Sequence, residues 1–388
     1  MAEGAVAEAY IVGAVRTPVG RRNGGLAGVH PVDLAAHVLT ELVARTGVDP
    51  AAVDDVIMGC VSQIGPQSID IARNAWLSAG LPENVPGVTI DRQCGSSQQA
   101  VHFAAQAVLS GTQDLVVAAG VENMSMVPMG STVTLPLASG MPLPYGQGWR
   151  DRYGDQEISQ FRGAQLVCEK WGIKRLQLEE YSLESHRRAI RAIDEGRFAI
   201  QITPVGGVTT DEGPRRDTSL EKMAALAPLR EGWEITAATA SQISDGAAAL
   251  MIASQDAVDR YGLTPRARIH ALAVTGSDPV FMLTGPIPAT EQALARGGLS
   301  IGDIDVFEVN EAFAPVLIAW SADTGASLQK TNPDGGAIAL GHPLGATGAI
   351  TMTKLLHELE LAGGRYGLQA MCEGGGQANA TIIERLAA

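Results

Sequence analysis

The stretch Val88–Gly120, VTIDRQCGSSQQAVHFAAQAVLSGTQDLVVAAG, decides the fold. It begins with a β-branched run at Val88–Ile90, continues as a helical pattern from about Ser96 to Leu109, and ends in an apolar strand at Leu115–Ala119. Strands that alternate with helices at this spacing predict an α/β sheet that is covered by helices.

The same alternation continues toward the N-terminus. A strand-like run lies at Ala9–Ala14, a helical pattern at Asp33–Arg45, and an apolar run at Val53–Val61. The first third of the chain is therefore predicted to form one α/β unit.

The C-terminal third of the chain repeats this order. Its matching segments are Arg268–Val274 for the first strand, Ile304–Val309 for Val53–Met58, Gly341–Gly348 for the helix start at Cys94–Ser97, and Leu368–Cys372 for Leu115–Ala119. This pattern predicts a duplicated α/β unit.

A segment of different character, at about Met124–Asp245, separates the two copies. It opens with the uncharged stretch Asn123–Trp149, in which four prolines argue against a membrane span and favour an ordered loop or a subunit contact. We expect three parts: an N-terminal half at 1–123 plus 246–267, an inserted loop domain at 124–245 that makes ligand and subunit contacts, and a C-terminal half at 268–388.

Charge and cysteine content exclude several classes of protein. The 388 residues hold 28 Lys and Arg against 42 Asp and Glu, a formal charge of −14, which argues against nucleic-acid binding. Glu3 and Glu8 interrupt any secretory signal, so the chain is predicted to be cytoplasmic. The four cysteines form no CxxC pair, which argues against a disulfide framework or a metal site and favours a reactive thiol.

Cys94 is the first candidate for that thiol. The motif Asp91-Arg92-Gln93-Cys94-Gly95-Ser96-Ser97 opens a helix, and the positive end of a helix dipole is expected to lower a cysteine pKa. The alternative interpretation is a small buried hydrophobe. The flanking small residues favour the reactive thiol, because they let a ligand approach the backbone.

Three further motifs carry polar groups at strand ends or helix starts. His342 lies in the glycine-rich run Gly335–Gly348, where it is either a general base or a packed turn residue. Cys372 precedes three glycines whose N–H groups are suited to an oxyanion, although a tight turn explains them equally. The amide of Asn310, in Asn310-Glu311-Ala312-Phe313, is suited to hold a water or a carbonyl, or to cap a helix.

Together, these four motifs resemble the thiolase family, in the family's order and along essentially the whole chain. The resemblance implies a five-layered αβαβα thiolase fold, built from two βαβαβαββ halves with an inserted loop domain. It also implies a homodimer or homotetramer, with acyl-CoA and CoA as partners, and neither nucleic-acid binding nor membrane insertion.

The resemblance implies an acyltransferase, a 3-ketoacyl-CoA thiolase (acetyl-CoA C-acyltransferase). It would cleave a 3-oxoacyl-CoA with CoA to acetyl-CoA, or another short acyl-CoA, and a shortened acyl-CoA. Cys94 would attack the keto carbonyl, with His342 as its base, and Cys372 would protonate the enolate and deprotonate CoA. Asn310 and His342 would form one oxyanion site, and the N–H groups of Cys94 and Gly374 the other.

CoA is expected as a substrate, with no permanently bound cofactor and no metal. Its phosphates require a local basic patch, for which the candidates are Arg215, Arg216, Lys222 and Arg230. The family pattern also implies that Ser241 contacts the pantetheine arm and that Phe313 lies beside the thioester channel.

Departures from the family pattern concern the substrate. Gln160–Gln165 replaces a common Met-Gly-x-Thr-Ala-Glu segment, Asp91 replaces an asparagine, and Glu373 occupies a position that is often apolar. The motif versions resemble degradative thiolases of actinobacteria, including those of steroid catabolism, which indicates a bulky acyl group in fatty-acid or steroid degradation.

Three alternatives stay open from the sequence. They are an acetoacetyl-CoA thiolase that works in the synthetic direction, a thiolase-like acyl-CoA or lipid-binding protein without turnover, and a ketosynthase. A ketosynthase would not need Cys372 in its present motif.

Overall fold

Ten strands form one continuous sheet in the computed structural model, which describes residues 7–386. Glu3, and the outermost residues of the two predicted terminal halves, lie outside the described residues. Nine strands follow the order β4-β3-β5-β6-β1-β7-β10-β9-β8, and β2 pairs with β6. The strands are β1 (Tyr10–Arg16), β2 (Gly20–Arg21), β3 (Asp55–Gly59), β4 (Gly87–Ile90), β5 (Leu115–Asn123), β6 (Ser244–Ala253), β7 (Ala267–Gly276), β8 (Val306–Val309), β9 (Tyr366–Glu373) and β10 (Gln377–Arg385).

The strand pairing confirms the predicted duplication. In the first half β3 pairs with β5 in parallel and β5 with β6 in antiparallel, and β8, β9 and β10 repeat this arrangement in the second half. The two halves differ in one strand. In the first half β3 pairs with β4, whereas at the matching place in the second half a single parallel bridge joins Phe307 and Thr331. Among the described residues, the sheets of the two halves are joined through two residue pairs of β1 and β7, Tyr10 with Arg268 and Ile11 with Ala267.

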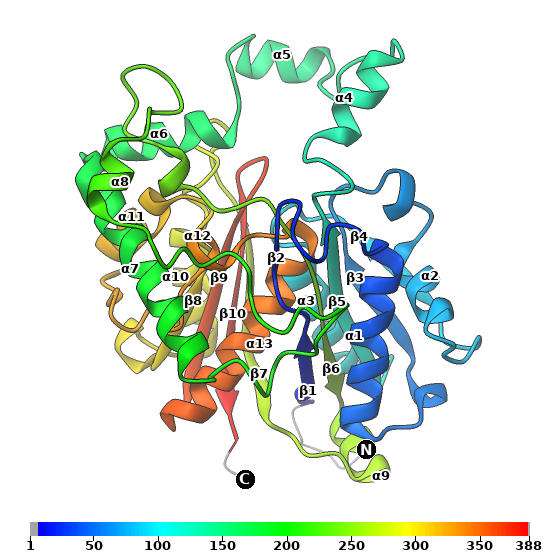
Figure 1. The fold of residues 1–388 in the computed structure, drawn as a ribbon. Coiled ribbons are helices and arrows are strands. Elements are labelled where there is room, and N and C mark those ends of the chain that lie inside the picture. Colours follow the sequence, from blue (N-terminus) through cyan, green and yellow to red (C-terminus); the bar gives the residue numbers. More distant parts are fainter. Residues whose placement is uncertain (1–6, 387–388) are drawn as a thin grey trace.

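Helices cover both faces of each half, because residues along the strands alternate between two cores. In β5, Leu115 and Val117 pack toward an outer core, whereas Val116 and Ala118 pack toward a central one. The outer core of the first half is completed by α1 (Pro31–Thr46) and α2 (Ile71–Ser78), the central core by α3 (Ser96–Leu109) and α13 (Leu344–Ala362), and the outer core of the second half by α10 (Pro286–Gly297) and α11 (Ala314–Thr324). The result is the expected five-layered αβαβα order (Figure 1).

The two central helices approach each other closely because glycines line their contact. A Cβ on Gly348 of α13 would lie 2.1 Å from the backbone nitrogen of Gln98 in α3. A Cβ on Gly120 of β5 would lie 2.3 Å from the carbonyl oxygen of Gly345. Small residues therefore bring the N-terminal ends of α3 and α13 together.

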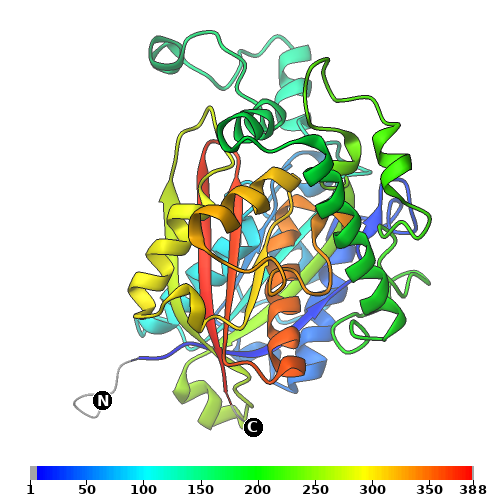
Figure 2. The ribbon, with the colours of Figure 1, turned by 90° about the vertical axis from the view of Figure 1, so that its left-hand side faces the viewer.

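The segment between β5 and β6 extends beyond the sheet. Its helices are α4 (Ser131–Ala138), α5 (Gln147–Tyr153), α6 (Gln160–Trp171), α7 (Arg175–Asp194) and α8 (Leu220–Ala224). Two short helices lie outside this segment: α9 (Gln255–Tyr261) connects β6 with β7, and α12 (Ala337–Leu340) lies between α11 and α13. Helices α4 and α5 project away from the body (Figure 1, Figure 2), and among the described helices none is long and apolar enough to cross a membrane.

A buried ion pair anchors this segment to the first strand. Arg16 of β1 donates to both carboxylate oxygens of Asp211, at 2.7 and 2.9 Å, and its Nε donates to Gln201 at 2.7 Å. Both charged side chains are fully buried. The inserted segment is thus fixed to the layer that carries the site described next.

Candidate active site

Cys94 lies in a tight turn between β4 and α3. Gln93, directly before it, has a left-handed backbone (φ 50°), which few residues other than glycine adopt. The Ser96 hydroxyl closes the turn, because it accepts from the Arg92 N–H at 2.9 Å and donates to the Gln93 carbonyl at 2.6 Å. This strained turn holds Cys94 just ahead of the first turn of α3.

The expected lowering of the Cys94 pKa is wrong for this state of the protein. Burial raises the pKa of the thiol to about 12, and the charge of Glu373 adds to the rise. The backbone N–H groups of Cys94 and Gly374 act in the opposite direction but do not compensate. Loss of hydration therefore outweighs the helix dipole, and Cys94 needs a base to become a thiolate.

His342 lies on the turn that leads into α13. Gly341 has φ 108°, and a Cβ there would lie 2.1 Å from the Ser244 Oγ, so the turn requires glycine. The His342 N–H donates to the Gln242 carbonyl at 3.0 Å and to the Ser244 Oγ at 3.2 Å. Burial lowers the pKa of His342 to about 4, so the imidazole is neutral at neutral pH.

Hydrogen bonds assign the tautomer of this imidazole. The Thr347 hydroxyl donates to the Pro343 carbonyl at 2.8 Å, so it accepts from the Nδ1–H of His342 at 2.7 Å. The lone pair is then on Nε2, which the Asn310 Nδ2 approaches to 3.4 Å. His342 therefore presents an unprotonated nitrogen, as a general base must.

Cys372 and Gly374 lie at the end of β9, against the Cys94 turn. A Cβ on Gly374 would lie 2.8 Å from the Gln93 Oε1, so the two loops are in contact. Burial raises the pKa of the Cys372 thiol well above its usual value, and the charges of Cys94 and Glu373 raise it further. The two thiols thus share one electrostatic environment.

Glu373 is an unexpected member of this group. Its side chain is fully buried, and both carboxyl oxygens lack a hydrogen-bond partner among the described residues. Burial raises its pKa to about 8, against the opposing pull of the Arg92 charge and the Asn379 N–H. A carboxyl with this pKa is mostly protonated at neutral pH.

Buried side chains hold the loop that carries Asn310. Glu311 accepts from Tyr181 (2.8 Å), Ser185 (2.7 Å) and Asn332 (3.0 Å), and also from the backbone N–H of Ile338 at 3.1 Å. These contacts join the Asn310 loop to α7 and to the segment before His342. The geometry of Asn310 and His342 is therefore set jointly.

Two neighbouring cavities lead away from His342. The inner cavity, about 210 Å³, is lined by His342, Ser241 and Phe313, with Phe161 packed edge-on against Phe313 at 5.7 Å between ring centroids. The outer cavity, about 240 Å³, shares Ala237, Ala240 and Gln242 with it and is lined by Arg215 and Lys222. A path thus runs from basic residues at the surface to the imidazole.

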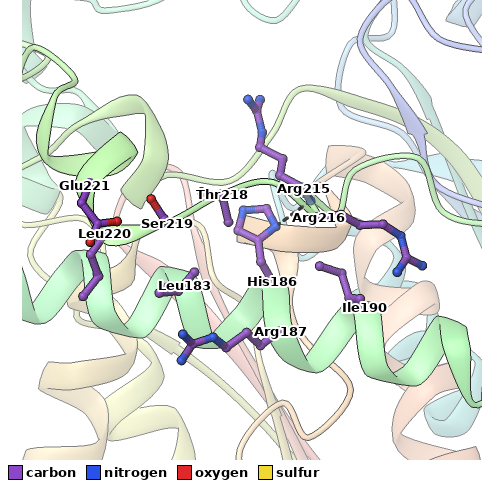
Figure 3. A pocket seen from close by; sticks show the side chains of 10 residues that line it. All are labelled: Leu183, His186, Arg187, Ile190, Arg215, Arg216, Thr218, Ser219, Leu220 and Glu221. Atoms are coloured by element: carbon purple, nitrogen blue, oxygen red, sulfur yellow. Dashed lines mark hydrogen bonds between the residues drawn. The ribbon is translucent and has the colours of Figure 1, made fainter.

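A third cavity, about 290 Å³, lies beside the outer one and gathers arginines. Arg187, Arg215 and Arg216 line it, and the Arg215 backbone N–H donates to His186 Nδ1 at 3.1 Å. Figure 3 shows His186 rising from α7 toward this segment while the Arg215 side chain points away from the helix. Arg216 is paired with Asp194, and Lys222 with Asp217.

The structure groups most of the predicted site residues. Cys94, Cys372 and Gly374 meet at one loop contact, and Asn310 approaches His342. Ser241 and Phe313 line the inner cavity and Arg215 the outer one. Arg230 lies outside the lining of these cavities and pairs with Glu157 at 2.9 Å.

Three residues that contribute to the site were not predicted from the sequence. Thr347 follows His342 by five residues, which is a distance that the turn into a helix can close. Glu311 is adjacent to Asn310 in its motif, which is the signal that could have identified it. Arg187 joins the basic cavity from α7, and no sequence pattern brings it next to Arg215.

Comparison with known families agrees with this geometry. The thiolase N-terminal domain family matches residues 9–256, and the thiolase C-terminal domain family matches residues 263–385. The chain is 60% identical to the steroid 3-ketoacyl-CoA thiolase FadA6 of Mycobacterium tuberculosis, over 98% of this chain and 94% of that protein. It is 43% identical to a beta-ketoadipyl-CoA thiolase of Escherichia coli, over 98% of this chain and all of the relative.

Solved structures of thiolases also superpose closely on this chain. Human mitochondrial 3-ketoacyl-CoA thiolase superposes with a TM-score of 0.89 at 36% identity, over 99% of this chain and 100% of that chain. Its complex with CoA superposes with a TM-score of 0.88 at 36% identity, over 98% of each chain. With a duplicated fold and both family domains present, the chain belongs to the thiolase family of acyltransferases.

Proposed function

We propose that the protein is a degradative 3-ketoacyl-CoA thiolase, which uses CoA to cleave a 3-oxoacyl-CoA into acetyl-CoA and a shortened acyl-CoA. One observation carries the proposal: Cys372 is buried against the turn that carries Cys94, beside the helix start that bears a neutral histidine. Cleavage of a carbon–carbon bond between two carbonyls requires a nucleophile, a base and a proton donor for the enolate.

The first half-reaction forms an acyl-enzyme. The Cys94 sulfur attacks the keto carbonyl as its proton passes to Nε2 of His342. The bond between C2 and C3 then breaks, and its electrons form the enolate of acetyl-CoA. Cys372 gives its proton to that enolate, which leaves the acyl group on Cys94 and a thiolate on Cys372.

The second half-reaction restores both cysteines. The Cys372 thiolate takes the proton of the incoming CoA thiol, and the CoA sulfur attacks the acyl group on Cys94. The Cys94 sulfur leaves and recovers the proton that His342 held. The raised pKa of both thiols supports this order, since each is protonated until a partner accepts the proton.

Two sets of donors would stabilise the oxyanions. The backbone N–H groups of Cys94 and Gly374 both lower the pKa of the Cys94 thiol, so they lie close to its sulfur. The reacting carbonyl would be bound to that sulfur and therefore within reach of both donors. Asn310, through a bound water, would act together with His342 at the other site. The buried Oδ1 of Asn310 has no partner among the described residues, which supports a bound water there.

The cavities support a binding mode for CoA. Arg215, with Arg187 beside it, would hold the phosphates, because neither arginine forms an ion pair with an acidic side chain in the part of the chain that the structure describes. Ser241 and Phe313 would contact the pantetheine arm and the thioester, since both line the inner cavity near His342. A CoA complex is known for the human mitochondrial relative.

The acyl group is proposed to be bulky, as in steroid degradation. The relative of 60% identity is a steroid 3-ketoacyl-CoA thiolase, and the 43% relative is a beta-ketoadipyl-CoA thiolase. The inner cavity is walled by Gln160 and Phe161, from the segment that departs from the common family pattern, together with Met129.

The assembly, location and domain limits are also proposed. Leu135, Leu137 and Met141 on and beside α4 are 55%, 49% and 59% exposed, which supports a subunit contact in a homodimer or homotetramer. We propose a cytoplasmic location. The division into 1–123 plus 246–267, 124–245 and 268–388 is supported by the end of β5 at Asn123.

The test is thiolysis of a substrate panel, compared by kcat/KM. The panel runs from acetoacetyl-CoA through long-chain 3-oxoacyl-CoA to 3-oxoadipyl-CoA and a ring-bearing steroid-derived thioester. We expect kcat/KM to rise with the bulk of the acyl group and to fall at least roughly 10³-fold in Cys94→Ala. Cys168→Ala, which removes another buried thiol, is the control. A maximum at acetoacetyl-CoA would overturn the degradative assignment, and thiolysis by Cys94→Ala would overturn the mechanism.

A further inference from the structure

A buried carboxyl beside the two cysteines has no hydrogen-bond partner. Glu373 ends β9 directly after Cys372, and its surface is fully covered. Neither of its oxygens has a hydrogen-bond partner of normal geometry among the described residues, although the Asn379 backbone N–H lowers the pKa of the carboxyl. Because buried polar groups are almost always partnered, an unpartnered carboxyl at a reactive site requires a functional explanation.

The fold makes room for this carboxyl next to the nucleophile. A Cβ on Gly95 would lie only 1.9 Å from Glu373 Oε1 and 2.6 Å from its carboxyl carbon. Gly95 is the residue that follows Cys94, so the carboxyl rests against the backbone of the nucleophile turn. Any side chain at position 95 would displace it.

The charged and titratable groups that face Glu373 come from the elements around it. The nucleophile turn contributes Arg92 and Cys94, its own strand contributes Cys372, and β10 contributes the Asn379 backbone N–H. Arg92 would be the natural ion-pair partner, yet its Nη1 donates at 2.6 Å to the Gln377 Oε1 instead. Glu373 therefore faces two thiols without a paired cation.

Two further titratable groups near the turn, Asp91 and His102, form hydrogen bonds with residues other than Glu373. The Asp91 carboxylate accepts from the Gln93 backbone N–H at 2.6 Å. His102 of α3 is bonded to Thr381 at 2.7 Å and to Asn379 at 3.3 Å. Neither donates a hydrogen bond to the Glu373 carboxyl.

We propose that Glu373 is a positioning residue that controls both cysteines through its charge: as a neutral carboxyl it permits them to become thiolates, and as a carboxylate it suppresses both. The inference rests on the proposed roles of Cys94 and Cys372, each of which passes through a thiolate. In a buried site with little water, a neighbouring negative charge opposes thiolate formation strongly. The raised pKa of Glu373 is consistent with a neutral carboxyl at neutral pH.

The test compares alkylation of Cys94 by iodoacetamide in the wild type and in Glu373→Gln across pH. Rates are read by mass spectrometry of the Cys94 peptide. At about pH 6 both side chains at 373 are neutral, so the ratio of variant to wild-type rate should be about 1. Near pH 9.5 the ratio should reach about threefold, because a Cys94 pKa lower by about one unit gives roughly tenfold more thiolate, of lower intrinsic nucleophilicity.

A merely structural role for Glu373 predicts a different result. If the substitution only disturbed the loop, the ratio would be the same at every pH, and that outcome would overturn the proposal. Glu291→Gln, which removes one negative charge from an exposed position on α10, is the control and should leave the ratio at 1 throughout. Glu373→Met replaces Glu373→Gln if the latter does not fold.

A measurement on the wild type alone gives a second check. Infrared difference spectra should contain a protonated carboxyl band near neutral pH that disappears at alkaline pH and is missing in Glu373→Gln. Absence of that band in the wild type would contradict the proposal. Neither measurement needs turnover, so a failure of this inference can be told apart from a failure of the substrate panel.

Discussion

The Thr347 hydroxyl determines which nitrogen of His342 is free to accept a proton. It is itself committed as a donor to the Pro343 carbonyl, so it can only accept from Nδ1–H. One hydroxyl thereby orients the imidazole and fixes its tautomer. The buried position of the histidine, 4% exposed, keeps water from replacing that bond.

We predict that Thr347→Val lowers kcat for thiolysis by roughly 10- to 100-fold with little change in KM. Valine has nearly the same shape but cannot accept from Nδ1–H, so part of the His342 population takes the inactive tautomer. Steady-state kinetics with the best substrate of the panel measure the effect. Thr347→Ser, which keeps the hydroxyl, should recover most of the activity, and an unaffected kcat in Thr347→Val would contradict the assignment.

At the scale of single residues, sequence motifs identify the candidate reactive residues but not their surroundings. Cys94, His342 and Cys372 each lie in a short motif, and such motifs can be read directly. The Cys94 pKa could not be predicted from its helix start, because the opposing influences come from burial and from Glu373, which is distant in sequence. The place of Arg187 in the basic cavity could not be predicted either, because its neighbour Arg215 is distant in sequence.

At the scale of elements, the contact between α3 and α13 determines how Cys94 and His342 lie relative to each other. Each helix starts two residues after its reactive side chain, at Ser96 and at Leu344. Gly348 lets the helices approach until their backbones nearly touch. The duplication thus places two equivalent helix starts side by side.

We predict that Gly348→Ala destabilises the protein by about 1–3 kcal/mol and lowers activity. The added methyl would lie 2.1 Å from the Gln98 backbone nitrogen, which cannot move aside as a flexible side chain can. Urea unfolding measures the change in stability. Gly28→Ala is the control, since a Cβ there meets no atom within 4 Å, and equal stability of the two variants would refute this explanation.

The repeat of strands and helices was predictable because apolar runs recur in the same order in both thirds of the chain. The absence of a counterpart to β4 in the second half was not predictable. Its remnant is a single bridge at Thr331, and one residue pair leaves no periodic pattern in the sequence.

At the scale of the whole molecule, the Arg16–Asp211 pair joins the inserted segment to the sheet. Its two hydrogen bonds and full burial distinguish it from the exposed ion pairs elsewhere in the molecule. The same Asp211 also accepts from the Val19 N–H at 2.8 Å. Loss of this carboxylate would leave a buried guanidinium without its charge partner.

Asp211→Ala should therefore lower the free energy of unfolding by about 3–5 kcal/mol. Chemical denaturation followed by circular dichroism measures it. Asp194→Ala, which removes one member of the exposed pair with Arg216, should have little effect. Similar losses in both variants would mean that burial of the Arg16 pair is not the cause.

The presence of an inserted segment was predictable from its change in composition, whereas its path was not. Pairing of Arg16 with Asp211 spans 195 residues, and no local pattern encodes a contact at that separation. The exposed apolar residues on α4 follow from an uncharged sequence, but their projection away from the sheet is a property of the fold.

The short ladder that joins the sheets of the two halves has a chemical consequence. Only two residue pairs connect β1 with β7, yet Cys94 belongs to one copy while His342 and Cys372 belong to the other. Under the proposed mechanism the site is therefore complete only where the two halves meet, and neither half alone holds the thiol nucleophile together with its base.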